Sequence, residues 1–313
     1  MALPLKSPIQ PQLARSKPEL PRGEQWVYEP KYDGFRAIAF VDGGESLIQS
    51  RGGKPLSRYF PELTFPPGRY ILDGEIVIDG DDGLQDFDAL QNRIHPAASR
   101  ITMLAEQTPA HYVAFDVLAR DDESLLELPL AERRAILEDL VAEPITLTPL
   151  TDGPDQAEPW LERGEGVVAK DRRAPYRPGQ RTGMVKVKRV RTIDVVVAGW
   201  RPGKEEGTVG SLILGLYDPE GKLHIVGHSS GLRAKEKRAL VEKLEPYATG
   251  HRGHGDASRW KNEKELEWVD LRPELVVEIT FDHTSGGRIR HGTKILRWRE
   301  DKAPRDCLLE QMK

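Results

Sequence analysis

Four clusters of charged side chains interrupt apolar, β-branched runs in the first part of the chain. They are Glu29–Arg36, Asp73–Glu75, Glu165–Lys170 and Lys186–Lys188. A strand that faces a core buries charge only for a reason, because an unpaired charge in an apolar interior is costly. Each cluster by itself is compatible with a loop charge or a surface ion pair. Together they form a set of carboxylates and lysines that would suit a polyphosphate and a divalent metal ion.

The elements that must carry these clusters are short strands with inserted helices. Apolar β-runs lie at residues 26–43, 69–78 and 111–120, and an Asp-Gly-Gly turn after the first run signals a hairpin. Apolar residues recur at helical spacing over 86–94 and 130–143. Antiparallel strand pairs with inserted helices predict an α+β domain, not a doubly wound parallel sheet.

The character of the sequence changes near residue 191. Strands broken by glycine-rich turns follow, with a hairpin turn at Asp218–Gly221, one helix over 232–247 and a further strand at 275–281. Several short strands with one helix indicate a small, partly open β-barrel of the OB type. We therefore predict two domains, residues 1–190 and 191–313.

Composition narrows the class of protein further. The net charge is −4, with 46 Lys and Arg against 50 Asp and Glu, which argues mildly against a bulk electrostatic binder of nucleic acid. Basic residues cluster locally, as in KVKRVR, RAKEKR and RIRHGTKILRWR. Cys307 is the single cysteine, so neither an intrachain disulfide nor a cysteine metal cage can form. Without a signal peptide or membrane-spanning run, we expect a cytoplasmic protein.

The charged clusters occur in a recognisable order. Along the chain stand KYDGFR, SRGG, LDGEIVI, FDVL, EGVVAK and KVK, followed near the end by Arg299-Glu-Asp-Lys302. This order resembles the nucleotidyltransferase motifs of the ATP-dependent DNA ligase and mRNA-capping superfamily, and the form of the tail favours DNA ligases. The compact layout is similar to the small bacterial C-type ligases and to the ligase domain of bacterial ligase D. The resemblance implies a nucleotidyltransferase (adenylation) domain followed by an OB-fold domain.

The resemblance implies a role for each cluster. Lys31 would be the nucleophile that takes AMP from ATP, and Asp33 would orient it. Making that amine neutral by lowering its pKa to about 7–8 takes roughly 3–5 kcal/mol, which burial and neighbouring cations can supply. Lys186 and Lys188 would stabilise the negative charge that grows on the α-phosphate.

Further residues would hold the nucleotide and the metal. Glu75 and Glu165 would bind Mg²⁺ or Mn²⁺, and Glu75 could also take the ribose hydroxyls. Phe115 would stack on adenine, with the Glu29 backbone at its edge. Basic residues would contact ribose or phosphates: Arg36, Arg51 and Arg181, and, at the departing pyrophosphate, Arg299 and Lys302.

The substrate implied is nicked duplex DNA, sealed by a monomer that acts in DNA repair and could bind other repair proteins. An RNA ligase and a GTP-using capping enzyme share the first six motifs, and a non-catalytic nucleic-acid-binding relative is the alternative from another class. Because Lys31 and Arg299 are expected at one ATP, the two domains would have to move relative to each other. Residues 191–194 are the expected hinge.

Overall fold

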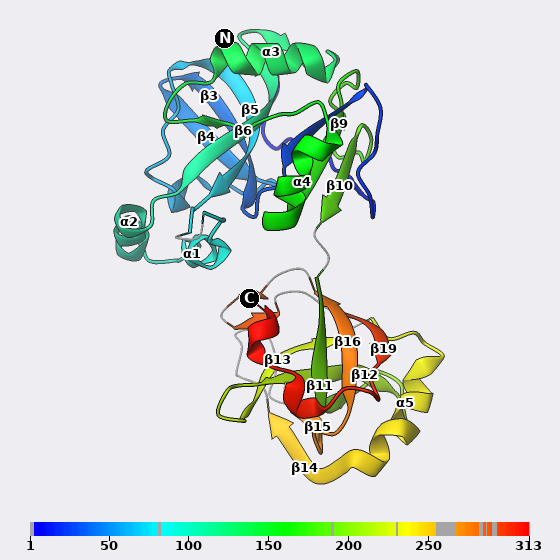
Figure 1. Cartoon of the computed structure of the whole chain (residues 1–313). Helices are drawn as coiled ribbons and strands as arrows, with labels where there is room; N and C mark the ends of the chain where they lie inside the picture. Colours follow the sequence, from blue (N-terminus) through cyan, green and yellow to red (C-terminus); the bar gives the residue numbers. More distant parts are fainter. Residues whose placement is uncertain are drawn as a thin grey trace. The chain divides into compact units, whose positions relative to one another are not determined.

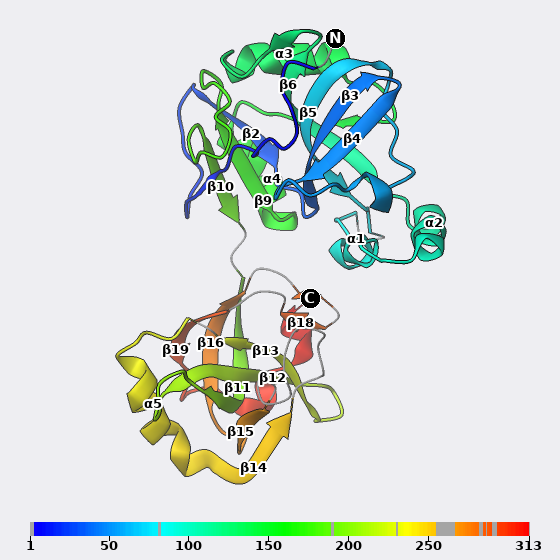
Figure 2. The ribbon, with the colours of Figure 1, turned by 180° about the vertical axis from the view of Figure 1, so that it is seen from behind.

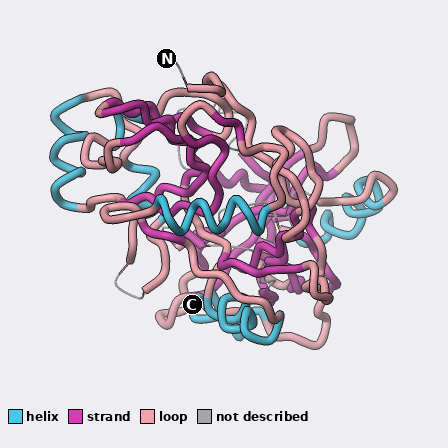
Figure 3. Tube along the Cα trace, turned by 90° about the horizontal axis from the view of Figure 1, so that it is seen from above, coloured by secondary structure: helices cyan, strands magenta, loops and turns pink. Residues whose placement is uncertain are grey.

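The computed structural model describes residues 3–80, 83–188, 191–229, 231–254, 267–281, 284–285, 287–289 and 293–312. The chain divides into two units, Met1–Arg189 and Val190–Lys313 (Figure 1). Strands greatly outnumber helices in the described part of the chain, as Figure 3 shows with strands in magenta. None of the described helices is long and apolar enough to span a membrane.

The first unit contains two sheets. Its strands are β1 Arg15–Ser16, β2 Trp26–Pro30, β3 Phe35–Gly43, β4 Glu45–Ser50, β5 Gly68–Val77, β6 His111–Arg120, β7 Glu123–Ser124, β8 Thr146–Leu147, β9 Gly166–Asp171 and β10 Met184–Lys188. Its helices are α1 Phe87–Asn92, α2 Ala98–Gln107, α3 Leu130–Leu140 and α4 Pro154–Arg163, with a short 3-10 helix at Ser57–Tyr59.

The larger sheet has the order β4-β3-β5-β6-β7, and β8 pairs with β6. Alternate residues of β3 enter different cores: Ala37 and Ala39 belong to one apolar cluster, and Ile38 and Phe40 to another. Side chains alternate between the two faces of a strand, so this sheet is buried on both sides. Tyr176, from the loop after β9, helps to cover the second face.

The smaller sheet has the order β1-β10-β9-β2, and α4 packs on β2 and β9. The N-terminal segment, dark blue in Figure 2, runs beside β10 and contributes β1 to the sheet, where Ser16 aligns with Lys186. Three charged clusters therefore lie on or next to one sheet: Lys31 directly after β2, Glu165 directly before β9, and Lys186 on β10.

The second unit is built from bent strands around a large apolar cluster, with a smaller one formed by Ala198, Ile213 and Trp268. Its strands are β11 Arg191–Pro202, β12 Val209–Tyr217, β13 Leu223–Ser229, β14 Ala248–His254, β15 Glu267–Leu271, β16 Val276–Phe281, β17 Thr284–Ser285, β18 Arg288–Ile289 and β19 Lys294–Trp298. The helices are α5 Glu236–Leu244 and 3-10 turns at Glu245–Tyr247, Pro304–Asp306 and Leu309–Met312.

Strand β11 shows how the sheet of the second unit curls. On one edge it pairs with β12, while on the other its first half pairs with β16 and its second half with β15. One strand that changes partner along its length bends the sheet toward a barrel. The predicted fold class, an α+β nucleotidyltransferase domain of antiparallel sheets followed by an OB-fold domain, is confirmed.

The predicted hinge is wrong. Residues 191–194 were expected to absorb a rotation, but each aligns with a residue of β16, from Arg191 with Phe281 to Asp194 with Glu278. Backbone held in a sheet ladder cannot change its dihedral angles without breaking the ladder. The second unit is therefore already formed at Arg191.

Candidate active site

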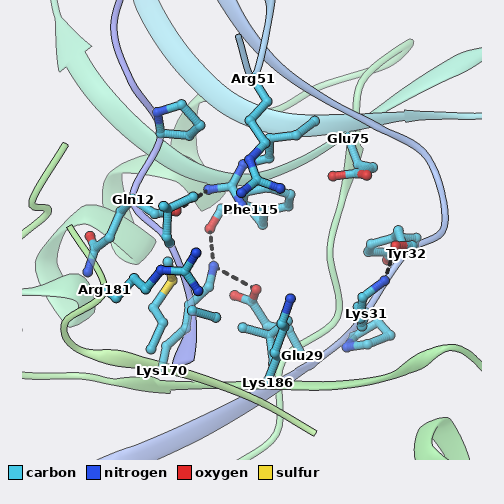
Figure 4. A pocket seen from close by; sticks show the side chains of 17 residues that line it. Gln12, Glu29, Lys31, Tyr32, Arg51, Glu75, Phe115, Lys170, Arg181 and Lys186 are labelled. Atoms are coloured by element: carbon cyan, nitrogen blue, oxygen red, sulfur yellow. Dashed lines mark hydrogen bonds and ion pairs between the residues drawn. The ribbon is translucent and has the colours of Figure 1, made fainter. Parts of the chain in front are cut away.

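A cavity of about 240 Å³ lies in the first unit, beside Lys31 (Figure 4). Its walls come from the N-terminal segment, from the end of β2 and from strands of both sheets. Eight predicted site residues line it: Glu29, Lys31, Arg36, Arg51, Glu75, Phe115, Arg181 and Lys186. Asp33, Glu165 and Lys188 are not among its lining residues.

Lys31 is held by its backbone and by its side-chain amine. Its backbone N–H donates to the Gly166 carbonyl at 2.9 Å, which fixes the turn after β2 against the start of β9. Its amine lies 3.1 Å from the Tyr32 carbonyl oxygen and 3.4 Å from a Glu165 carboxylate oxygen. These contacts fix the position of the Lys31 amine next to the Glu165 carboxylate.

Gly34 lets this turn approach strand β5. A Cβ atom at Gly34 would lie 2.3 Å from the Ile76 carbonyl oxygen and 2.8 Å from Cγ of Glu75, so any larger residue would force the strand away. The close approach brings Asp33 and Lys31 into the electrostatic environment of Glu75. Gly34 of KYDG is thus required because the two segments pack closely here, and not because its backbone has a positive φ angle.

Glu75 has an unusual protonation equilibrium. Burial raises its pKa to about 7; Arg36 and Lys31 oppose that rise, whereas Asp73 and Asp33 add to it. A carboxyl group that is only partly ionised near neutral pH will become fully ionised when a cation approaches. Glu75 is therefore suited to bind a cation or to accept hydrogen bonds from hydroxyl groups.

Two cations lie against the Phe115 ring. The Arg36 guanidinium carbon is 4.5 Å from the ring centroid and the Lys170 amine is 4.7 Å from it. Lys170 also donates to the Phe115 carbonyl at 3.1 Å and forms a 2.7 Å ion pair with Glu29, as the dashed lines in Figure 4 show. These contacts fix an aromatic ring at the cavity wall, where it can stack on a planar ligand.

Glu29 contributes a buried acceptor. Its Oε2 atom takes the Lys170 ion pair, while Oε1 is buried without a hydrogen-bond partner. Burial raises the pKa of Glu29, and Lys170 opposes that rise. The sequence predicts that the Glu29 backbone faces the adenine edge. In the structure that backbone pairs with β9 in the smaller sheet, opposite Val168. It is the side chain that offers an unmet acceptor to a ligand.

Cations also line the cavity, among them Arg51, Arg181 and Lys186, and we term these three the cationic wall. Burial lowers the pKa of Lys186, and the charges of Lys188, Lys31, Arg51 and Arg181 lower it further. Within the described parts of the chain, no carboxylate forms an ion pair with Lys186, Arg51 or Arg181. Like charges held together in this way favour the binding of a polyanion.

Arg299 and Lys302 lie in the second unit, so neither belongs to the cavity described here. The Arg299 guanidinium is bonded to both carboxylate oxygens of Asp194, at 2.9 and 3.1 Å, and to Asp301 at 2.9 Å. These carboxylates raise its pKa further. Arg299 therefore already has anionic partners within its own unit.

The carboxylates near Lys31 are suited to bind the predicted Mg²⁺ or Mn²⁺ ion. The described residues contain no group of three or more His, Cys, Asp or Glu side chains placed to hold a metal ion. Both carboxylates interact with Lys31. The charge of Lys31 lowers the pKa of Glu75, and a Glu165 carboxylate oxygen lies 3.4 Å from the Lys31 amine. Two carboxylates fit Mg²⁺ or Mn²⁺, because these ions keep several waters and use substrate phosphates as further ligands.

Several residues of the site had no predicted role. Lys170 and Asp73 fall inside the charged clusters, so a polar residue in an apolar strand was the signal that could have identified them. Gln12, Tyr32 and Tyr176 carry no such signal. Gln12 comes from a proline-rich N-terminal segment and reaches the site only through the fold.

An amine at a cavity with an aromatic wall, a cationic wall and nearby carboxylates defines a covalent nucleotidyltransferase. Comparison with known proteins agrees. The model of the ATP dependent DNA ligase domain matches residues 11–188, and that of the ATP dependent DNA ligase C terminal region matches residues 205–302. The chain belongs to the ATP-dependent DNA ligase family, which confirms the resemblance seen in the motifs.

Individual relatives place the chain within that family. DNA ligase C1 of Mycolicibacterium smegmatis is 42% identical, over 100% of this chain and 96% of the relative. The multifunctional non-homologous end joining protein LigD of the same organism is 34% identical over 92% of this chain, but only 38% of that protein is covered. A solved structure of mycobacterial DNA ligase D complexed with ATP and MES is 30% identical, with a TM-score of 0.54 and coverage of 96% and 98%.

Proposed function

We propose that the chain is an ATP-dependent ligase that seals nicks in duplex DNA through an AMP adduct on Lys31. The observation that carries this proposal is the position of the Lys31 amine, between the cavity and the Glu165 carboxylate. In the first step the Lys31 Nζ lone pair would attack the α-phosphorus of ATP, and pyrophosphate would leave. In the second step a DNA 5′-phosphate oxygen would take the AMP from Lys31. In the third step the adjacent 3′-hydroxyl would displace AMP and close the nick.

The cationic wall supplies the electrostatic part of the mechanism. Lys186, with Lys188 two residues further along β10, would stabilise charge on the α-phosphate as the bond to Lys31 forms. Arg51 and Arg181 would bind the ribose or the outer phosphates. Because burial and neighbouring cations already disfavour the charged form of Lys186, an incoming anion gains more there than at an exposed lysine.

Glu75 and Glu165 would hold a Mg²⁺ or Mn²⁺ ion, which would supply neutralisation of the phosphate charge. Glu165 would also hold the Lys31 amine in place, through the ion pair that joins the two side chains at 3.4 Å. Asp33 would help to orient the amine.

The base end of the cavity favours adenine over guanine. Phe115 would stack on the base, and the partnerless Oε1 of Glu29 accepts hydrogen bonds. Adenine carries an amino group at position 6, which can donate to that oxygen. Guanine carries a carbonyl there, which would place two acceptors together in a buried site. This argues against the GTP-using alternative.

Arg299 and Lys302 would orient the departing pyrophosphate when the second unit closes over the nucleotide. Nicked duplex DNA would then bind basic surface that includes KVKRVR, of which Arg189 and Val190 lie outside the described residues, and strands near Gly227–Arg233, of which Ser230 is not described. DNA repair is the role that the named relatives suggest. We expect a cytoplasmic monomer, with other repair proteins as possible partners.

Sealing of a labelled nicked duplex tests this proposal. ATP with Mg²⁺ or Mn²⁺ should give sealed product, whereas GTP, or ATP in chelator, should give none. A nick carrying a 3′-ribonucleotide should be compared with an all-DNA nick. A lysyl-GMP adduct formed from GTP would support the capping alternative, and sealing of RNA strands only would support the RNA-ligase alternative. Duplex binding without any adduct would support the non-catalytic one.

A further inference from the structure

A segment at the N-terminus forms one wall of the cavity. Residues 11–14, which we term the strap, all line it. The strap is hydrogen-bonded to residues 176–183, which we term the strap loop. The Leu13 N–H donates to the Gln180 carbonyl at 2.8 Å, and the Arg177 N–H donates to the Gln12 side chain at 3.0 Å. The strap and the strap loop therefore form one hydrogen-bonded unit over the nucleotide cavity.

One buried side chain connects that unit to the sheet beneath. The Tyr176 hydroxyl donates to Asp73 on β5 at 2.6 Å and accepts from the Gln12 backbone N–H at 2.9 Å. A phenol has one proton to donate, so these two bonds use its donor and one acceptor position. Tyr176 is 1% exposed and Asp73 is 0% exposed, so water cannot replace either bond.

The same carboxylate orients Arg36. Asp73 accepts two hydrogen bonds from the Arg36 guanidinium, both at 2.6 Å, and a third Arg36 bond reaches the Gln12 carbonyl at 3.3 Å. The guanidinium is thereby held over the Phe115 ring. Within the part of the chain that the structure describes, the remaining amino group, Nη1, has no hydrogen-bond partner. It keeps two N–H donors at the cavity that Arg36 lines.

We propose that Tyr176 is a positioning residue for ATP binding, which fastens the strap over the cavity and, through Asp73, orients Arg36 beside Phe115. This inference rests on the proposed function. Tyr176 touches no reacting atom. Its contribution concerns how well the walls are arranged before ATP arrives, so its loss should weaken binding and leave the chemical step at saturating ATP nearly unchanged.

Tyr176→Phe is the direct test, because it removes the hydroxyl and keeps the ring. Without it the Gln12 N–H is buried without an acceptor, and the strap should detach part of the time. The KM for ATP in Lys31 adduct formation should rise about five- to tenfold, with kcat within about twofold of the wild type. Hydrogen exchange at the Gln12 amide should accelerate as well.

Tyr70→Phe is the matched control. Tyr70 is also buried, on β5, and its hydroxyl donates to the Pro66 carbonyl, outside the cavity lining. The control should lose similar thermal stability without a change in KM. If Tyr176→Phe fails to fold, Asp73→Asn is to be measured instead, with the same expected rise in KM.

Two results would overturn the inference. One is a KM for Tyr176→Phe equal to that of Tyr70→Phe. The other is a parallel loss of kcat, melting temperature and exchange protection throughout the first unit, which would show a purely structural role. Failure of the proposed function looks different, because the wild type itself would then form no adduct from ATP.

Discussion

The cations at the nucleotide cavity and Arg299 near the end of the chain differ in whether a carboxylate pairs with them. In the first unit, Lys186, Arg51 and Arg181 line the cavity, and no carboxylate of the described residues pairs with them. In the second unit, Arg299 is bonded to Asp194 and Asp301. The cavity is therefore arranged for a polyanion in advance. Arg299 already has two carboxylate partners, so we expect a rearrangement of these contacts if it is to bind a phosphate.

Lys31→Ala should have the largest effect. It removes the attacking atom, so the AMP adduct should fall at least about a thousandfold, below detection in a gel assay with labelled ATP. Sealing of DNA that already carries a 5′-adenylate should persist, because the lysine is needed only to load AMP. Equal loss in both assays would mean that Lys31 supports the fold of the cavity instead of reacting.

Lys186→Ala should come next, with about a hundredfold slower adduct formation. The lost charge lies at a site prepared for the α-phosphate, and Lys186→Arg should recover part of the rate because it keeps a cation on β10. Lys294→Ala is the control, as an exposed lysine of the second unit. A Lys186→Ala variant that behaves like the control would remove the cationic wall from the mechanism.

Arg299→Ala combined with Lys302→Ala should have a smaller, step-specific effect. We expect about a tenfold loss in adduct formation, and less than about twofold in sealing of pre-adenylated nicks, since no pyrophosphate departs in that step. Asp194→Asn removes the negative charge that now pairs with Arg299. It should therefore be measured in the same two assays, adduct formation and sealing of pre-adenylated nicks. If both variants damage the two steps equally, the tail only stabilises the second unit.

Glu75→Gln should show an effect of another kind, a change in how the stability of the protein depends on pH. Between pH 4.5 and about 7 the folded protein holds a proton on Glu75 that the unfolded chain has lost, so stability falls as the pH rises through this window. The glutamine variant does not titrate. Relative to the wild type it should gain at most about 3 kcal/mol between pH 4.5 and 8, measured by urea unfolding in chelator. A difference that stays constant with pH would refute the raised pKa.

The sequence was most informative where the chemistry is local. Lys31, Glu75, Phe115 and Lys186 stand inside short motifs on strands or directly after one, and the fold brings all four to one cavity. The Gln12–Tyr176 hydrogen bond joins residues 164 positions apart, and neither partner interrupts a periodic pattern. Such a contact depends on how two loops meet over a sheet, for which a single sequence holds no signal.

The errors have the same origin. Asp194 was assigned to a hinge because the composition changes there, whereas its backbone pairs with β16 and its carboxylate holds Arg299. A change in composition marks where one unit ends and another begins. It does not show which residues of the new unit are already held by hydrogen bonds to strands far along the chain.

The most direct test of the account is to locate the AMP on the protein. The wild-type enzyme, incubated with ATP and Mg²⁺ or Mn²⁺, would be digested under conditions that preserve the phosphoramidate bond, and its peptides sequenced by mass spectrometry. A single AMP should be found on Lys31, and it should be absent when pyrophosphate is supplied in excess, because the first step then reverses. An AMP on Lys186, Lys170 or any other lysine, with Lys31 unmodified, would contradict it.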